Sequence, residues 1–270
     1  MRARRALILA GGLGRRMQTD DPQAALDDGQ RKAAEAGLKA LIPIAGRPFL
    51  DYVISSLADA GLDDVGLVIS PGPNLLRQHY ETRPPHRVTL RFIEQAVPRG
   101  TADAILCARE WAGRDPFIAL NADNLYPVDA LRALAMLDGP GLPVFEREEL
   151  VASSNITAER VQAFALLEVG ATQLLERIIE KPAPDQMPPP GVPMLVSMNC
   201  WRLDASIFDA CRDVAPSLRG EVELPQAVML AIERGVPFRA IPATGPVLDL
   251  SRRADAAAVA ARLHGVAVSV

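Results

Sequence analysis

Through the first half of the chain, short runs of apolar residues alternate with longer stretches in which apolar residues recur every three or four positions. The short runs predict buried strands at 6–10, 65–70, 88–94 and 117–121. The longer stretches predict helices at 48–60 and at 101–111, the second with Thr101 as its N-cap. Strands that alternate with helices are typical of a mostly parallel sheet covered on both faces, so we expect a Rossmann-like, three-layer α/β fold.

The second half of the chain is less regular. We predict a pair of strands at 163–169 and 174–180, joined by a turn that begins at Gly170, and then a proline-rich surface loop at 185–193. Further strands are expected at 194–203 and 236–241, and further helices at 204–212, 224–234 and 252–263. Because no linker-like change of composition is visible, we expect a single domain over residues 1–270.

The first predicted strand runs directly into a glycine-rich turn. Gly11, Gly12 and Gly14 can adopt backbone angles that other residues avoid, and they leave room for a ligand. Such a turn offers main-chain N–H groups to phosphate oxygens, and a helix starting there adds its positive end. The downstream cations that suit a triphosphate are Arg15, Arg16 and Lys39. The alternative is an ordinary tight turn with solvated arginines, because the pattern matches neither the dinucleotide fingerprint nor the P-loop.

A second chemical feature is Asp123, which follows the strand predicted at 117–121. In open α/β sheets, ligands bind beyond the carboxyl ends of the strands. The glycine-rich turn and Asp123 both follow such ends. We therefore expect one shared binding site at this edge of the sheet.

Several motifs in a fixed order extend this interpretation. They are Leu9-Ala-Gly-Gly-Leu-Gly-Arg-Arg-Met17, Lys39-Ala-Leu-Ile-Pro-Ile-Ala-Gly-Arg-Pro48, Gln95 with Gly100-Thr-Ala102, Asp123-Asn124, Glu180-Lys-Pro182 and Arg219-Gly-Glu-Val-Glu223. In this order they resemble the sugar nucleotidylyltransferases (NDP-sugar pyrophosphorylases), most visibly the glucose-1-phosphate thymidylyl- and uridylyltransferases. The resemblance runs from about Ala6 to about Asp255. It implies a GT-A-like nucleotidyltransferase fold, with a nucleotide-binding half at about 1–125 and a sugar-binding half at about 126–255.

The resemblance also implies roles for individual residues. Mg²⁺ would be held by Asp123 and the late Asp249, which fits the preference of this ion for carboxylates and substrate phosphates. Gln95, which carries a donor and an acceptor, would pair with a pyrimidine edge. The catalytic residues would be Arg16, Lys39, Asp123 and Lys181. The nucleotide-binding residues would be Leu9, Ala10, Gly11, Gly12, Gly14, Arg15, Gln95, Pro98, Gly100 and Thr101. The sugar-binding residues would be Asn124, Glu180, Asn199, Trp201 and Glu221.

The sequence departs from the family's pattern at several of these motifs. Ala122 replaces the glycine that usually precedes the metal-binding aspartate. Asn199 and Trp201 stand where glycine and tyrosine are usual, in the segment that would line the sugar pocket. The residues after Asp249 lack the usual Gly-Thr, because Ser251 follows a leucine there. We therefore expect the sugar side to differ more from the family than the nucleotide side.

The connection between the glycine-rich turn and Lys39 is also unusual. Arg16 and Lys39 lie 23 positions apart, which is more than is usual in the family, and Arg15 stands where many relatives carry threonine. The charged segment 18–36 is either a lid over the nucleotide or a solvated insertion. Its run of charges favours the solvated insertion.

Charge and cysteine content narrow the range of partners. The formal net charge of −4 gives no basic surface for nucleic acid. Three scattered cysteines show neither a disulfide framework nor metal-ligand spacing, which suits a reducing, cytoplasmic environment. No segment has the unbroken apolar length of a transmembrane helix, so we expect no membrane partner. The sequence leaves homo-oligomerisation open, and we expect no β-helix extension of the kind that some relatives carry.

Together these features predict an enzyme that transfers a nucleotidyl group from a nucleoside triphosphate to a sugar 1-phosphate. Such in-line transfers need positioning and charge neutralisation more than a protein nucleophile. Two alternatives stay open: a nucleotidyltransferase with a non-sugar acceptor, and a non-catalytic protein that binds a nucleotide or a nucleotide sugar. A metal-dependent glycosyltransferase of related fold is disfavoured, because the glycine–arginine turn has no role there. The sequence does not identify the base or the sugar.

Overall fold

The parallel part of the central sheet forms from the apolar runs of the first half. β1 (Arg5–Leu9) lies between β6 (Phe117–Asn121) and β4 (Asp64–Ile69) and pairs in parallel with both. β5 (Thr89–Glu94) continues the sheet beside β4. The middle three residues of β1 are buried, because both faces of the strand are covered, and this is why its sequence is continuously apolar instead of alternating. The carboxyl ends of these strands meet at one edge.

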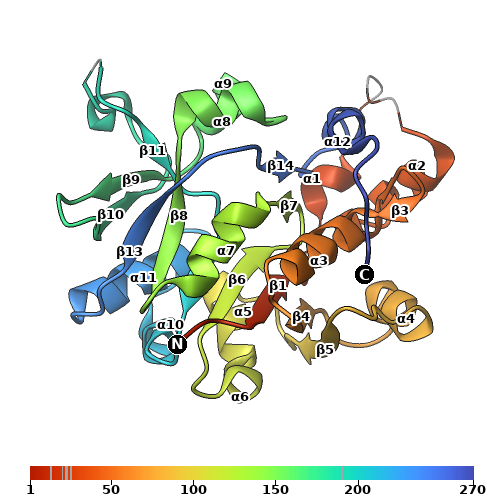
Figure 1. The fold of residues 1–270 in the computed structure, drawn as a ribbon, viewed down its shortest axis with the longest axis horizontal. Coiled ribbons are helices and arrows are strands. Elements are labelled where there is room, and N and C mark those ends of the chain that lie inside the picture. Colours follow the sequence, from red (N-terminus) through yellow and green to blue (C-terminus); the bar gives the residue numbers. More distant parts are fainter. Residues whose placement is uncertain (13, 20, 22–23, 25, 190) are drawn as a thin grey trace.

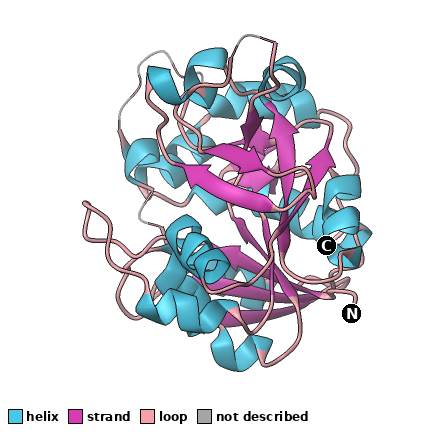
Figure 2. Ribbon diagram, turned by 90° about the vertical axis from the view of Figure 1, so that its left-hand side faces the viewer, coloured by secondary structure: helices cyan, strands magenta, loops and turns pink. Residues whose placement is uncertain are grey.

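This computed structural model describes residues 1–12, 14–19, 21, 24, 26–189 and 191–270. In that part of the chain the central sheet has ten strands, with helices on both faces (Figures 1 and 2). The predicted three-layer α/β architecture with a mostly parallel mixed sheet is confirmed. None of the described helices is long and apolar enough to cross a membrane.

Beyond β6 the sheet continues with strands of two to six residues, most of them paired antiparallel. In spatial order they are β12 (Trp201–Leu203), β8 (Gly141–Glu146), β11 (Leu195–Val196), β9 (Leu166–Val169) and β10 (Leu175–Ile179), with β13 (Arg239–Ala243) pairing in parallel with β8. Two small ladders lie outside this sheet. They are β7 (Asn124–Leu125) with β14 (Leu248–Asp249), and β2 (Pro43–Ile44) with β3 (Arg47–Pro48).

The helices divide between two hydrophobic cores, one on each face of the sheet. The first core contains residues of α1 (Arg15–Gln18), α2 (Asp28–Glu35), α3 (Phe49–Asp59), α4 (Leu75–Thr82), α7 (Val128–Met136), α8 (Arg147–Ser153), α9 (Ala158–Val161) and α12 (Asp255–Leu263). The second contains residues of α5 (Thr101–Cys107), α6 (Arg109–Ala112), α10 (Ile207–Asp213) and α11 (Leu224–Glu233). Short 3₁₀ turns lie at Lys39–Leu41 and Pro184–Gln186.

The single strand predicted at 194–203 is wrong. The structure has two short strands there, β11 and β12, separated by residues 197–200. Asn199 in this break has a φ of 57°, a left-handed conformation that cannot continue a strand. The chain therefore changes direction in the middle of an apolar run, and the apolar pattern alone gives no sign of it.

The predicted N-cap at Thr101 is also wrong. Gly100 occupies the N-cap position of α5, and Thr101 is the first helical residue. The Thr101 hydroxyl instead accepts a hydrogen bond of 2.8 Å from the backbone N–H of Leu224. The threonine thus joins α5 to the start of α11, and the helix predicted at 101–111 is divided into α5 and α6 at Ala108.

Several elements were shifted or missed. The strand predicted at 236–241 lies at Arg239–Ala243, and the helix predicted at 252–263 begins at Asp255. β8 was missed because its sequence contains Gly141 and Pro143, residues that normally interrupt strands. A Cβ at Gly141 would lie 2.4 Å from the Arg239 carbonyl oxygen, so the glycine permits close contact with β13.

The described part of segment 18–36 contains α2, which has an exposed polar face. Asp27 and Gln30 form a capping box at its start, and the buried Gln30 side chain donates 2.9 Å to the Pro43 carbonyl. α2 therefore packs on the β2–β3 hairpin through one face. Its outer face agrees with a solvated insertion, and residues 20, 22–23 and 25 lie outside the described part.

Gly100 provides a test of the contact between the start of α5 and the loop before α11. Its φ is 123°, and a Cβ would lie 2.2 Å from the Val222 carbonyl oxygen, which accepts from the Ala102 N–H. We expect Gly100→Ala to lose about 2 kcal/mol through backbone strain. It should lose about 1 kcal/mol more because this hydrogen bond is disrupted. Urea unfolding measures the loss.

Gly113→Ala is the matched control. Gly113 also has a positive φ, but a Cβ there would meet no atom within 4 Å. Its variant should lose only the strain of about 2 kcal/mol. Equal losses for the two variants would contradict the proposed importance of the Val222 contact.

Candidate active site

The glycine-rich turn packs against the segment that carries Lys39. Gly14 has a φ of 61°, and a Cβ on it would lie 2.4 Å from the Gly37 carbonyl oxygen. Only glycine fits this position, and the contact places Lys39 beside the turn. The helix expected after the turn is α1, which is a single turn of four residues. Leu13 and the Arg15 side chain lie outside the described part of the site.

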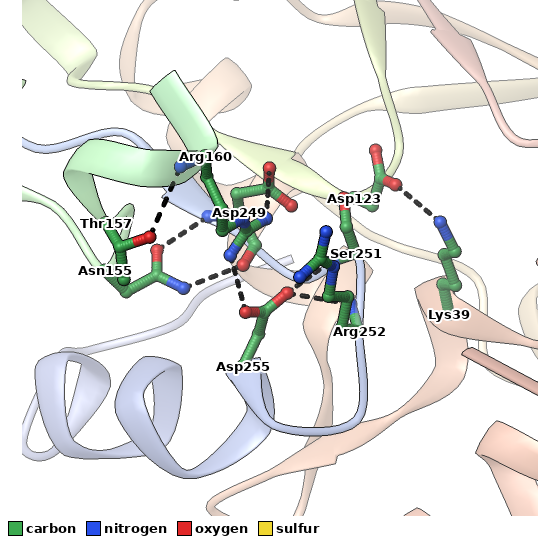
Figure 3. A network of polar contacts seen from close by, with 9 residues as sticks. All are labelled: Lys39, Asp123, Asn155, Thr157, Arg160, Asp249, Ser251, Arg252 and Asp255. Carbon is green, nitrogen blue, oxygen red and sulfur yellow. Dashed lines mark hydrogen bonds and ion pairs between the residues drawn. The ribbon is translucent and has the colours of Figure 1, made fainter. Parts of the chain in front are cut away.

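Asp123 lies just beyond β6, as the sequence predicts, and is held by three segments. The Ala122 N–H donates 3.2 Å to the Leu9 carbonyl, and the Leu250 N–H donates 2.9 Å to the Asp123 carbonyl. The Asp123 carboxylate forms an ion pair of 3.0 Å with the Lys39 ammonium (Figure 3). All three contacts come from segments far away in the sequence.

The β7–β14 ladder brings the second aspartate to the first. Its register pairs Asn124 with Asp249, so Asp249 lies beside the turn of Asp123. The Asn155 side chain fixes the Asp249 backbone by donating 2.8 Å to its carbonyl and accepting 2.9 Å from its N–H. Burial raises the pKa of the Asp249 carboxyl above its usual value, and the negative charge of Asp123 raises it further.

These two carboxylates are suitable ligands for a hard divalent cation. The Oδ1 atom of Asp249 is buried and has no hydrogen bond of normal geometry to a described residue, while the nearby Ser251 side chain and Arg160 oppose the rise in the pKa of this carboxyl. A buried carboxylate oxygen without a well-aligned donor beside a second carboxylate fits Mg²⁺. Among the described residues there is no group of three or more histidine, cysteine, aspartate or glutamate side chains that could hold a metal ion. Further ligands would have to come from substrate phosphates or water.

The predicted site residues surround two adjoining cavities, of about 740 and 780 Å³. The cavities share Leu9, Gly14, Arg16, Lys39, Thr101, Asp123 and Asn199. Only the first contains Asn124, Glu180, Lys181, Trp201 and Asp249, and only the second contains Ala10, Gly11, Gly12, Gln95, Pro98, Gly100 and Glu221. The structure therefore brings to one cleft every predicted site residue whose side chain it describes. The roles assigned to them stay predictions.

Gln95 is held in one orientation at the second cavity. Its amide nitrogen donates 3.0 Å to the Gly100 carbonyl and 2.8 Å to the Asp103 carboxylate. Because both partners are acceptors, the amide oxygen must point the other way. A Cβ at Gly11 would lie 3.5 Å from that oxygen, so Gln95 presents an acceptor toward the glycine-rich turn.

Carboxylates and cations alternate at the far end of the first cavity. Glu180 and Lys181 directly follow β10, and Arg219 forms an ion pair of 2.8 Å with Glu223 on the opposite wall. Desolvation in the cleft raises the pKa of the Glu180 carboxyl above its usual value, and the negative charge of Glu223 raises this pKa further. Arg219 and Lys181 oppose this shift.

The structure accounts for one of the two sequence departures in this cavity. Asn199 has a φ of 57°, and asparagine adopts this left-handed conformation more readily than most residues other than glycine. The exchange of glycine for asparagine therefore preserves the backbone. Trp201 is 1% exposed and belongs to the hydrophobic core beneath the cavity, so it contributes to the cavity floor.

Sequence reasoning missed several residues in or beside the cleft. Arg160 on α9 binds Asp249, and Asn155 fixes its backbone, yet neither belongs to a recognised motif. Their role depends on the position of β14, which is distant in sequence. Arg219 directly precedes the Gly-Glu-x-Glu motif and Glu223 is its last residue, so that motif could have identified them.

Comparison with known proteins identifies the family. A family model described as "Nucleotidyl transferase" matches residues 34–246, and the chain belongs to this family. Among curated relatives, the low-salt glycan biosynthesis nucleotidyltransferase Agl11 of Haloferax volcanii is 27% identical over 236 residues, covering 86% of this chain and 58% of the relative. A glucose-1-phosphate thymidylyltransferase of Streptomyces antibioticus is 26% identical, covering 93% of this chain and 64% of the relative.

Solved structures agree in fold. A UDP-glucose pyrophosphorylase complexed with UDP-glucose matches with a TM-score of 0.73 at 15% identity, covering 97% of this chain and 98% of the other. A UTP-bound UGPase from Acinetobacter baumannii matches with a TM-score of 0.71 at 17% identity, covering 98% and 95%. The chain spans about half of the length of several curated relatives that it matches, such as the bifunctional protein GlmU of Methanococcus maripaludis.

Asn199 provides a test of the backbone break at the cleft. We expect Asn199→Ala to lower the free energy of unfolding by about 1 kcal/mol, because alanine disfavours the left-handed conformation. Asn199→Gly should retain wild-type stability within a few tenths of a kcal/mol, since glycine adopts it without a Cβ penalty. Denaturant unfolding compares the two variants. An alanine variant as stable as the glycine variant would show that the left-handed conformation does not constrain this segment.

Proposed function

We propose that this protein transfers a nucleotidyl group from a nucleoside triphosphate to a sugar 1-phosphate, giving an NDP-sugar and pyrophosphate. One observation carries the proposal: a continuous cleft joins the glycine-rich turn to Glu180 and Lys181, with Lys39, Asp123 and Asp249 between them. Relatives named as glucose-1-phosphate thymidylyl- and uridylyltransferases support it. The nucleotide would occupy the half at about 1–125 and the sugar the half at about 126–255.

The reaction is an in-line displacement at phosphorus. An oxygen of the sugar 1-phosphate forms a bond to the α-phosphorus, the bond from that phosphorus to the bridging oxygen breaks, and pyrophosphate leaves with the electron pair. Both substrates are anions, so their approach requires cations on either side. Arg16, Lys39 and Arg219 line both cavities, whereas Lys181 lines only the first cavity, on the sugar side.

Asp123 and Asp249 would hold Mg²⁺, which would neutralise charge on the triphosphate. Lys39 is paired with Asp123 at 3.0 Å in the substrate-free cleft. When a triphosphate binds, its oxygens offer this ammonium a second anionic partner. Lys39 therefore holds the Asp123 carboxylate in place before binding and neutralises phosphate charge afterwards.

The base would lie beside Gln95. The amide oxygen of Gln95 faces the glycine-rich turn, so this oxygen would accept a hydrogen bond from the ring N3–H of uracil or thymine. Cytosine has an acceptor at that ring position. This supports a uridine or thymidine triphosphate as the nucleotide substrate.

The decisive experiment measures pyrophosphate release with Mg²⁺ over a grid of nucleoside triphosphates and sugar 1-phosphates. We expect release to depend on one base and one sugar phosphate. Asp123→Asn and Lys39→Ala should lower turnover by about a hundredfold or more, because each removes a charge that positions the phosphates.

Lys32→Ala is the matched control, since Lys32 is exposed on the outer face of α2. Near-normal turnover in both cleft variants would refute the proposed mechanism. Silence across the whole grid, with nucleotide binding still detectable by calorimetry, would favour a non-sugar acceptor or a non-catalytic binding protein.

Glu180 predicts a pH dependence of sugar binding. As a carboxylate it would accept hydrogen bonds from sugar hydroxyls. Because its pKa is raised, it protonates at higher pH than an ordinary glutamate as the solution is acidified. We expect the KM for the sugar 1-phosphate to rise as the pH falls from 7 to about 5. Glu180→Gln should show a raised KM that retains only the titration of the substrate phosphate. Identical profiles in the two proteins would contradict this role.

A further inference from the structure

Arg160 is a largely covered arginine that is paired with two buried aspartates at the wall of the first cavity. Its Nη2 lies 2.9 Å from Oδ2 of Asp249, and its Nη1 lies 2.6 Å from Oδ1 of Asp255 (Figure 3). The side chains are only 13% exposed for the arginine and 8% for each aspartate. The guanidinium thus uses two nitrogens on one rigid plane to join two carboxylates.

Asp255, the far partner, is itself fixed. Its Oδ2 accepts hydrogen bonds from the backbone N–H groups of Ser251 at 2.9 Å and Arg252 at 2.7 Å. It therefore acts as a rigid anchor at the start of α12. Its negative charge also offsets the positive charge of Arg160, which is paired with both carboxylates.

The two carboxylate oxygens of Asp249 have different surroundings. Oδ2 is bound to Arg160, and the backbone is fixed by Asn155. Oδ1 is buried and has no hydrogen bond of normal geometry to a described residue. The Asp123 carboxylate lies on the cleft side of this network, with Lys39 beyond it (Figure 3).

We propose that Arg160 is a positioning residue that holds Asp249 so that its Oδ1 is the cation-binding atom. This inference rests on the proposed divalent-cation site at Asp123 and Asp249. A positive charge near a cation site opposes cation binding by Coulomb repulsion. The arginine therefore contributes by orienting the ligand, and outer partners of metal ligands commonly act in this way.

Two substitutions separate orientation from charge. Arg160→Lys keeps the charge, but one ammonium cannot present two coplanar N–H groups to both aspartates. Arg160→Met removes the charge and the hydrogen bonds. We expect both variants to bind Mn²⁺, used alone as the probe, about tenfold more weakly than wild type. Water proton relaxation measures this affinity without turnover. A purely electrostatic role would instead leave the lysine variant unchanged and tighten binding in the methionine variant, and would overturn the proposal.

Controls keep the two proposals distinguishable. Arg234→Lys alters an exposed arginine–aspartate pair, 2.9 Å from Asp213 and remote from the cleft, and should bind Mn²⁺ as wild type does. Thermal unfolding identifies any variant that fails to fold. Since the lysine variant keeps the charge, it carries the test if the methionine variant unfolds.

If Asp123→Asn abolishes Mn²⁺ binding but both Arg160 variants match wild type, the Arg160 inference is wrong and the cation site stands. If wild type itself binds no Mn²⁺, the cation site is wrong as well.

Discussion

A two-residue ladder holds the chemical centre of this protein together. β7 directly follows Asp123, and β14 ends in Asp249, so their antiparallel pairing places two carboxylates side by side from segments far apart in the sequence. The backbone bond from Leu250 to Asp123 reinforces the pairing at the same point. The two negative charges repel each other. Lys39 offsets this repulsion by pairing with Asp123, and Arg160 does so by pairing with Asp249. The site therefore depends on the pairing of β7 with β14 more than on any single sequence motif.

The fold was predictable where apolar patterning is set by burial on both faces. The continuous apolar runs around β1, β4 and β6 indicate strands covered by helices, and the structure agrees. Prediction failed where the backbone changes direction inside an apolar run. The break at Asn199 depends on one residue in a left-handed conformation, and β8 contains a glycine and a proline that usually end strands. At β8, tertiary contacts outweigh local preference.

The residues of the candidate site were likewise only partly predictable from the sequence. Residues within ordered motifs, such as Asp123, Gln95 and Glu180, were found from sequence because their spacing resembles a family, and the structure brings them to one cleft. Arg160 was not found. Its partner Asp255 lies 95 positions away, and no local pattern distinguishes a buried arginine on a four-residue helix from a surface one. Residues that orient the ligands of a site are identified by tertiary contacts, and a single sequence does not reveal these contacts.

The loop that carries Gln95 and the loop that carries Arg219 are joined by their backbones. The Val222 N–H donates 2.8 Å to the Arg99 carbonyl, the Ala102 N–H donates 3.0 Å to the Val222 carbonyl, and Thr101 accepts from Leu224 at 2.8 Å. One loop borders the cavity nearer the glycine-rich turn, and the other borders both cavities. A substitution that moves either loop therefore moves the other. Retargeting one of the two ligands by protein engineering therefore requires redesigning both loops as a unit.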